Sequence, residues 1–135
     1  MTLPVTAALT VAMATLLLLL AIDTVRSRFR TRIPHGTGED LKLTAASRSH
    51  GNLAEHAPIV ILLVALLEMS QAHHIGLMAV SGAFILARLL HIWGLYSQRP
   101  EMNGPPWQRA VGVILTWIVL AVLIGWTLAL LSTHL

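Results

Sequence analysis

Residues 48–55 read Arg48-Ser49-His50-Gly51-Asn52-Leu53-Ala54-Glu55, and a long apolar run follows them directly. In a helix, Arg48, Asn52 and Glu55 stand at i, i+4 and i+7 and therefore share one face. We interpret this polar face as a candidate binding site. Its expected partner is Arg88, which lies inside the next apolar segment, where a charge is costly unless another group pairs with it.

The composition is that of a membrane protein. The chain has 135 residues, of which 56% are hydrophobic and 11% charged, and its mean hydropathy is +0.74. Soluble domains carry about 25% charged residues. There is no cysteine, which excludes disulfides, thiolate metal sites and a cysteine nucleophile, so any thiol chemistry must use a thiol on the substrate. The formal charge of +3 arises mainly in segments that flank apolar runs, so membrane topology explains it better than a nucleic-acid partner.

Four apolar segments are long enough to cross a hydrocarbon core of about 30 Å at about 1.5 Å per residue. The predicted helices are residues 3–22, 44–71, 75–96 and 109–131. No Lys or Arg precedes the first segment and the positive charges follow it, so we expect a retained helix rather than a cleaved signal peptide. The predicted fold is an all-α membrane protein, a bundle of four transmembrane helices in one domain, residues 1–135.

The basic residues predict the orientation. All nine Lys and Arg residues lie in or beside the loops 23–46 and 97–108, except Arg88. By the positive-inside rule both loops are cytoplasmic and both termini lie outside. We interpret Arg28, Arg30 and Arg32 as a patch that contacts anionic lipid rather than as catalytic groups.

Depth in the membrane suggests that Glu55 and Arg88 meet. Glu55 lies about 10 Å of helical rise beyond Arg48, and Arg88 lies about 12 Å before Tyr96, both measured from the same side. An unpaired charge at that depth costs at least about 2.5–3.5 kcal/mol. We therefore predict an Arg88–Glu55 ion pair or a polar cavity that both residues share. The alternative is a pair that only fastens two helices and binds no ligand.

The pattern Arg48-x-x-x-Asn52-x-x-Glu55, followed one helix later by Ala87-Arg88-Leu89-Leu90-His91 and Gly94, resembles the MAPEG superfamily, the membrane-associated proteins in eicosanoid and glutathione metabolism. The likeness covers nearly the whole chain and is most similar to the bacterial branch. It implies a homotrimer in the bacterial inner membrane that binds glutathione between subunits, near the cytoplasmic side. Family members include glutathione transferases, glutathione peroxidases and the leukotriene C and prostaglandin E synthases.

The resemblance also implies roles for individual residues. It places Arg48, Asn52 and Glu55 in the glutathione pocket. It makes Arg88 both the polar anchor of the third helix and a candidate catalytic residue, and it puts His91 at another pocket position.

Other positions match the family less closely. Arg26 resembles an arginine that holds a glutathione carboxylate. The thiol-activating arginine of some synthases corresponds to either Arg99 or Arg109. Those synthases often carry a tyrosine where this chain has Leu95, and Tyr96 lies one place later, on a different helical face.

Such a site suits glutathione, which has two carboxylates, one ammonium group and a thiol. Guanidinium groups bind carboxylates in a bidentate manner, while Glu55 or Asn52 would meet the ammonium or a backbone amide. Lowering a thiol pKa from about 8.5 by about two units requires about 2.7 kcal/mol of thiolate stabilisation. A hydrophobic electrophile would enter from the membrane lipid along the first and fourth helices, and neither a metal nor a covalent enzyme intermediate is needed.

Three functions follow as alternatives. The first is a glutathione transferase or peroxidase. The second is a family member that binds lipid or glutathione without turnover, suggested by Leu95. The third is a small proton-coupled exporter, suggested by Glu55 and Glu68 in an apolar helix; it is disfavoured because Arg88 lies at the depth of Glu55 and because Glu68 lies close to the outer boundary.

Overall fold

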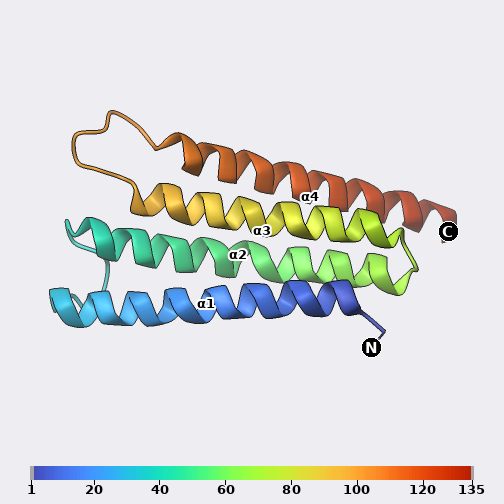
Figure 1. Cartoon of the computed structure of the whole chain (residues 1–135), viewed down its shortest axis with the longest axis horizontal. Helices are drawn as coiled ribbons and strands as arrows, with labels where there is room; N and C mark the ends of the chain where they lie inside the picture. The colour runs from blue at the N-terminus through green and yellow to red at the C-terminus, as the bar shows by residue number, and fades with distance from the viewer. Residues whose placement is uncertain (1, 135) are drawn as a thin grey trace.

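The computed structural model describes residues 2–134, and in that range the chain forms four α-helices and no strand (Figure 1). The helices are α1 (Pro4–Thr31), α2 (Leu41–Met69), α3 (His74–Tyr96) and α4 (Trp107–His134). They run alternately up and down, so that both termini lie at one end of the bundle and the connections 32–40 and 97–106 lie at the other (Figure 1). We call this second end the loop end, and the two connections loop one and loop three.

Each helix is long and apolar enough to span a membrane. Large hydrophobic side chains cover much of the outer surface, including Leu18, Leu62, Leu86 and Ile118, each more than half exposed. Helices that are apolar all round are typical of membrane spans, because lipid rather than water surrounds them. The predicted all-α bundle of four transmembrane helices is confirmed.

The helix α1 is longer than the sequence suggested. It continues to Thr31 instead of ending at residue 22, and α2 begins at Leu41 rather than residue 44. Residues 23–31 contain no proline or glycine, and the breakers Pro34, Gly36 and Gly38 all follow. A polar composition therefore marked the expected membrane boundary but not the end of the helix.

Polar contacts join α1 and α2 at both ends. At the loop end, Asp40 caps α2 by accepting a hydrogen bond from the Leu43 backbone N–H at 2.7 Å, and Arg30 donates to both of its carboxylate oxygens, at 2.7 and 3.0 Å. These donors hold the pKa of Asp40 down at about 2, the Arg30 guanidinium being the largest cause.

At the other end, the buried Glu68 side chain caps α1. Its carboxylate accepts hydrogen bonds from the backbone N–H groups of Val5 and Thr6, both at 2.8 Å, and from the Thr6 hydroxyl at 2.7 Å. An anion at a helix N-terminus satisfies donors that have no partner within the helix. The sequence placed Glu68 near the boundary but did not predict this role.

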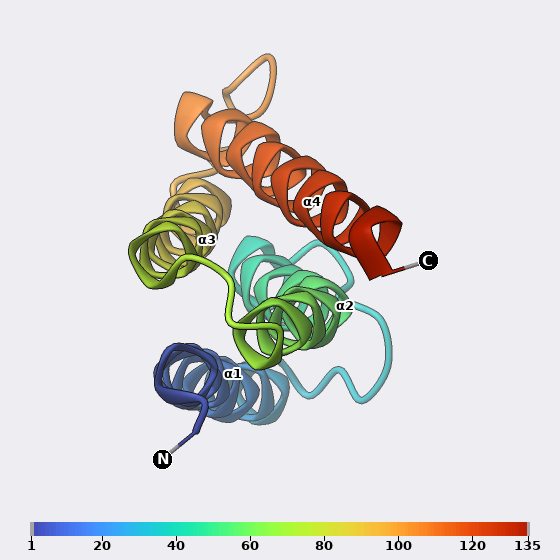
Figure 2. The same ribbon diagram turned by 90° about the vertical axis from the view of Figure 1, so that its right-hand side faces the viewer.

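The helices α2 and α3 each contact all three other helices. By contrast, α1 and α4 lie on opposite sides of the bundle (Figure 2). Leu9, Val60, Phe84 and Leu123, one from each helix, are fully buried in the shared core.

Two glycines bring α3 and α4 into backbone contact. A Cβ atom on Gly94 would lie 2.3 Å from the Arg109 nitrogen, and one on Gly112 would lie 2.6 Å from the His91 nitrogen. Only glycine fits at these distances, so the two helices cross closely at the loop end. This crossing places the first turn of α4 against the last turns of α3.

Candidate functional site

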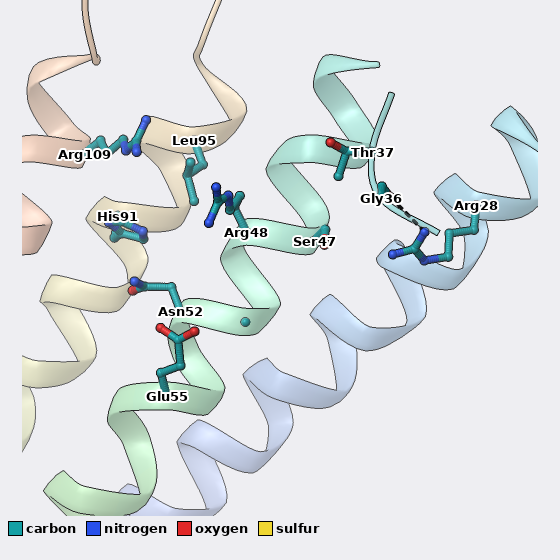
Figure 3. A pocket seen from close by; sticks show the side chains of 11 residues that line it. Arg28, Gly36, Thr37, Ser47, Arg48, Asn52, Glu55, His91, Leu95 and Arg109 are labelled. Atoms are coloured by element: carbon teal, nitrogen blue, oxygen red, sulfur yellow. Dashed lines mark hydrogen bonds between the residues drawn. The ribbon is translucent and has the colours of Figure 1, made fainter. Parts of the chain in front are cut away.

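A polar cavity of about 550 Å³ opens at the loop end between loop one and the four helices (Figure 3). We call it the polar cavity. Its lining residues are Arg28 of α1, Gly36 and Thr37 of loop one, Ser47, Arg48, Gly51, Asn52 and Glu55 of α2, His91 and Leu95 of α3, and Arg109 of α4. Segments distant in the sequence therefore contribute charged and polar groups to one volume.

The polar face of α2 forms one wall. Arg48, Asn52 and Glu55 all line the cavity, so the predicted shared face is confirmed. Arg48 and Glu55 are exposed in the single chain, and the one ion pair within residues 2–134 joins Arg30 to Asp40. The charged groups of the α2 face are thus not neutralised by an ion pair in the described structure.

The prediction that Arg88 and Glu55 form an ion pair or share a cavity is wrong: within residues 2–134 they form no ion pair, and Arg88 is not among the residues that line the polar cavity. The Arg88 side chain is only 2% exposed and donates hydrogen bonds to the Asn52 side-chain oxygen, to the Thr116 hydroxyl and, at 3.3 Å, to the Gly112 carbonyl. The depth estimate was sound, but Asn52, one turn from Glu55, and the neighbouring helix α4 supply neutral acceptors at the same level. Arg88 therefore lies behind the cavity wall and connects α2, α3 and α4.

His91 and Arg109 form the opposite wall. His91 is buried, lines the cavity, and its Nδ1 atom has no hydrogen-bond partner within residues 2–134. Arg109 lies in the first turn of α4, where the close contact with Gly94 positions its backbone. A ligand in the cavity would therefore meet an imidazole and a guanidinium next to each other.

Arg28 enters from α1. One of its guanidinium nitrogens donates to the carbonyls of Ile33 and Pro34, both at 3.2 Å, and to that of Gly36 at 3.0 Å, the last of which is drawn in Figure 3. These bonds hold loop one against the cavity, and Arg28 forms no ion pair with a carboxylate in the described part of the chain.

Comparison with known proteins identifies the family. Residues 6–129 match the model of the MAPEG family. The chain belongs to the MAPEG family. It is 33% identical over 121 residues to inner membrane protein YecN of Escherichia coli K12, an alignment that covers 89% of this chain and 87% of YecN. YecN from E. coli O6:H1 strain CFT073 matches to the same extent.

Within the MAPEG fold, the structure separates the predicted arginines. Arg109 and Arg28 line the polar cavity, whereas Arg26 and Arg99 do not. The sequence missed Arg28 because loop one was expected to begin at residue 23. Because α1 extends through both residues, Arg26 and Arg28 point about 200° apart around the helix. A prediction that continued the helix to residue 31 would have placed the two side chains on different faces.

The departure from the MAPEG synthase pattern at residue 95 is visible in the cavity. Leu95 is buried and contributes an apolar side chain to the lining. Tyr96 instead donates a hydrogen bond to the Asp23 carboxylate of α1, as expected for a different helical face. The cavity wall therefore has no phenol at these two positions.

Proposed function

We propose that this MAPEG protein is an integral inner-membrane enzyme that uses glutathione to conjugate or reduce hydrophobic electrophiles. The observation that carries the proposal is the convergence of three guanidinium groups, one carboxylate and one amide on a single cavity at the loop end. The inner-membrane location rests on the four spans and on the similarity to YecN. The basic residues gathered at the loop end support, by the positive-inside rule, a cytoplasmic position for that end.

The charges of the cavity complement glutathione. Arg28, Arg48 and Arg109 offer planar donors for two carboxylates, and Glu55 offers an acceptor for the ammonium group. The volume of about 550 Å³ falls within the usual range of small-ligand sites. Asn52 accepts from Arg88 through its side-chain oxygen, which leaves its amide N–H groups to donate to the peptide.

Arg109 is the group we assign to the thiol. It lies in the first turn of α4, where the positive end of the helix dipole adds to the charge of the guanidinium. Lowering the thiol pKa by about two units requires about 2.7 kcal/mol, which one such cation in a partly dehydrated site can supply. The thiolate would then attack the electrophile and displace its leaving group, with no bond formed to the enzyme.

The electrophile would reach Arg109 from the lipid. A groove of about 400 Å³ on the outer surface of α4 is lined by Pro105, Arg109, Ala110, Val113, Ile114 and Trp117. Arg109 is common to this groove and to the polar cavity. A membrane-dissolved molecule in the groove would therefore lie close to a thiolate held in the cavity.

We further propose that the active form is the homotrimer implied by the family. Arg48 and Glu55 are exposed in the single chain, so a second copy packed against this side would enclose a bound glutathione. The mass of the purified protein in detergent, measured by analytical ultracentrifugation, tests this assembly: a monomer under conditions that support activity would contradict it.

Conjugation of a chlorinated nitrobenzene with glutathione tests the catalytic proposal. We expect the purified protein to catalyse it, and Arg109→Ala to lower kcat by about 10²–10³-fold, as for loss of a group that stabilises an anionic reacting atom. Arg99→Ala removes the same charge at the same end of the molecule but outside the cavity, and should retain activity. Equal losses in the two variants would contradict the role of Arg109.

Two alternatives remain distinguishable. Saturable glutathione binding without conjugation or peroxide reduction would favour the binding protein suggested by Leu95. The exporter hypothesis relied on Glu55 and Glu68 as proton-carrying acids. Glu68 is less suited to that role, because its carboxylate caps α1. Drug resistance conferred by the protein and abolished by Glu55→Gln would favour transport, whereas resistance that survives the change would remove it.

A further inference from the structure

The end of α1 carries side chains that the proposed glutathione site does not use. Val25 and Phe29 stand one turn apart on α1, and Arg32 is the residue that follows the end of the helix. Phe29 is 81% exposed, although it is among the largest apolar residues of the chain. An aromatic ring held away from the core next to a cation indicates contact with something outside the described chain.

These residues line a second hollow at the loop end. It has a volume of about 490 Å³ and is lined by Val25, Arg28, Phe29, Arg32, Ile33 and Pro34. We call it the α1 groove. Its walls are largely apolar, with guanidinium groups beside them, which is the chemistry of an amphiphile with an anionic head and a hydrocarbon chain.

Of the three arginines predicted to form a lipid patch, Arg28 and Arg30 have partners within the chain. Arg30 forms its ion pair with Asp40, and Arg28 donates to the carbonyls of loop one. Arg32 is exposed and makes no ion pair within residues 2–134. The patch predicted from sequence as three equivalent arginines thus reduces to one free guanidinium at this groove.

The length of α1 places the groove at the level of lipid headgroups. Counted from Pro4 at about 1.5 Å per residue, Val25 lies about 31 Å along the helix and Arg32 about 42 Å. The hydrocarbon core is about 30 Å thick, and the headgroups extend the bilayer to about 40–45 Å. With Pro4 at one edge of the hydrocarbon, Val25 lies at the other edge, and Arg32 follows about 11 Å farther out, from where its long side chain can extend back toward the lipid phosphates.

The backbone at Arg32 is a second, independent observation. Arg32 follows the last residue of α1 with a φ of 57°, in the left-handed region. Glycine or asparagine is favoured at this position of a helix end, and other residues adopt it at a cost. A non-glycine residue in this costly conformation is consistent with a functional role for its side chain.

We propose that the α1 groove binds an anionic phospholipid of the leaflet at the loop end. The Arg32 guanidinium pairs with the lipid phosphate, and an acyl chain lies against Phe29 and Val25. The partner is a lipid rather than a soluble anion, because the groove continues from the phosphate level onto an apolar wall at the hydrocarbon edge.

Native mass spectrometry of the full chain, extracted from equal amounts of phosphatidylglycerol and phosphatidylethanolamine, tests the proposal. We expect the wild-type protein to retain the anionic lipid preferentially, and Arg32→Asn to lower that preference about fivefold, the effect of one basic residue near an anionic surface. Asparagine accepts the left-handed backbone, so this variant should fold as stably as the wild type, which its thermal unfolding verifies.

Two further variants make the result specific. Lys42→Gln removes one exposed positive charge at the same end but outside the groove, and should keep the preference. Phe29→Ala should lower retention of the lipid without changing the oligomeric mass. The proposal would be overturned if the wild type retained both lipids equally, or if Arg32→Asn and Lys42→Gln had equal effects. A change of oligomeric mass in Phe29→Ala would also overturn it, because this face would then be a protein interface.

Discussion

Arg88 is a buried cation whose partners are all neutral. It donates to side chains of α2 and α4 and to the Gly112 carbonyl, and its guanidinium lies 5.6 Å from the centre of the Phe84 ring. The planar guanidinium group has several N–H donors and can bind acceptors on two helices at once. A lysine ammonium on its flexible side chain does this less well. Arg88 is therefore an anchor of the fold that also orients Asn52 at the cavity wall.

Removing this side chain should destabilise the protein. We expect Arg88→Ala to lower the free energy of unfolding by about 2–4 kcal/mol, because it leaves the Asn52 oxygen without its donor and opens a void in the core. Thermal unfolding in detergent measures the effect, and the exposed Arg99→Ala should change stability by less than about 0.5 kcal/mol. A stability loss no larger in Arg88→Ala than in Arg99→Ala would mean that Arg88 is not a structural anchor.

Asp40 makes a contribution to stability that depends on pH. Its pKa in the folded protein is about 2, below its ordinary value of 3.8, so the folded state favours the charged carboxylate. The stabilisation is complete above the ordinary pKa and is lost as the pH falls toward about 2. We expect the melting-temperature advantage of the wild type over Asp40→Ala to be constant from neutral pH to about 5 and to shrink between about 4 and 2. An advantage that stays constant down to pH 2 would contradict this linkage.

At the scale of elements, the crossing of α3 and α4 determines where Arg109 lies. Gly94 has no room for a side chain, so Gly94→Ala must push the first turn of α4 away from α3. We expect a loss of about 1–3 kcal/mol of stability from overpacking, together with weaker glutathione binding because Arg109 moves. Gly125 has open space around it, and Gly125→Ala should leave both properties intact. Indistinguishable behaviour of the two alanine variants would rule out the crossing as a determinant of the site.

The elements also show how far sequence reasoning extends. The apolar runs located all four helices because hydrophobic length is a strong local signal. The end of α1 was placed too early because polarity marks where a helix leaves the hydrocarbon, whereas only Pro34 and the glycines after it end the helix. Helix ends in water are determined by breakers and caps such as Asp40.

At the scale of the whole molecule, the predictable part of the site was the part encoded on one helix. Arg48, Asn52 and Glu55 share a face through helical periodicity alone, and the structure places all three in the cavity. Which residue binds Arg88, and whether Arg28 lines the cavity, depend on which helices are neighbours and on how far each helix extends. Those are tertiary facts that local spacing does not contain.

The central claim is that the polar cavity at the loop end binds glutathione. Isothermal titration of the purified protein in detergent with reduced glutathione tests it directly. The account predicts saturable binding, weakened about tenfold or more in Arg48→Ala through loss of a charge-assisted hydrogen bond and unchanged in Lys42→Ala outside the cavity. Absence of binding at millimolar glutathione to protein that remains folded would contradict it.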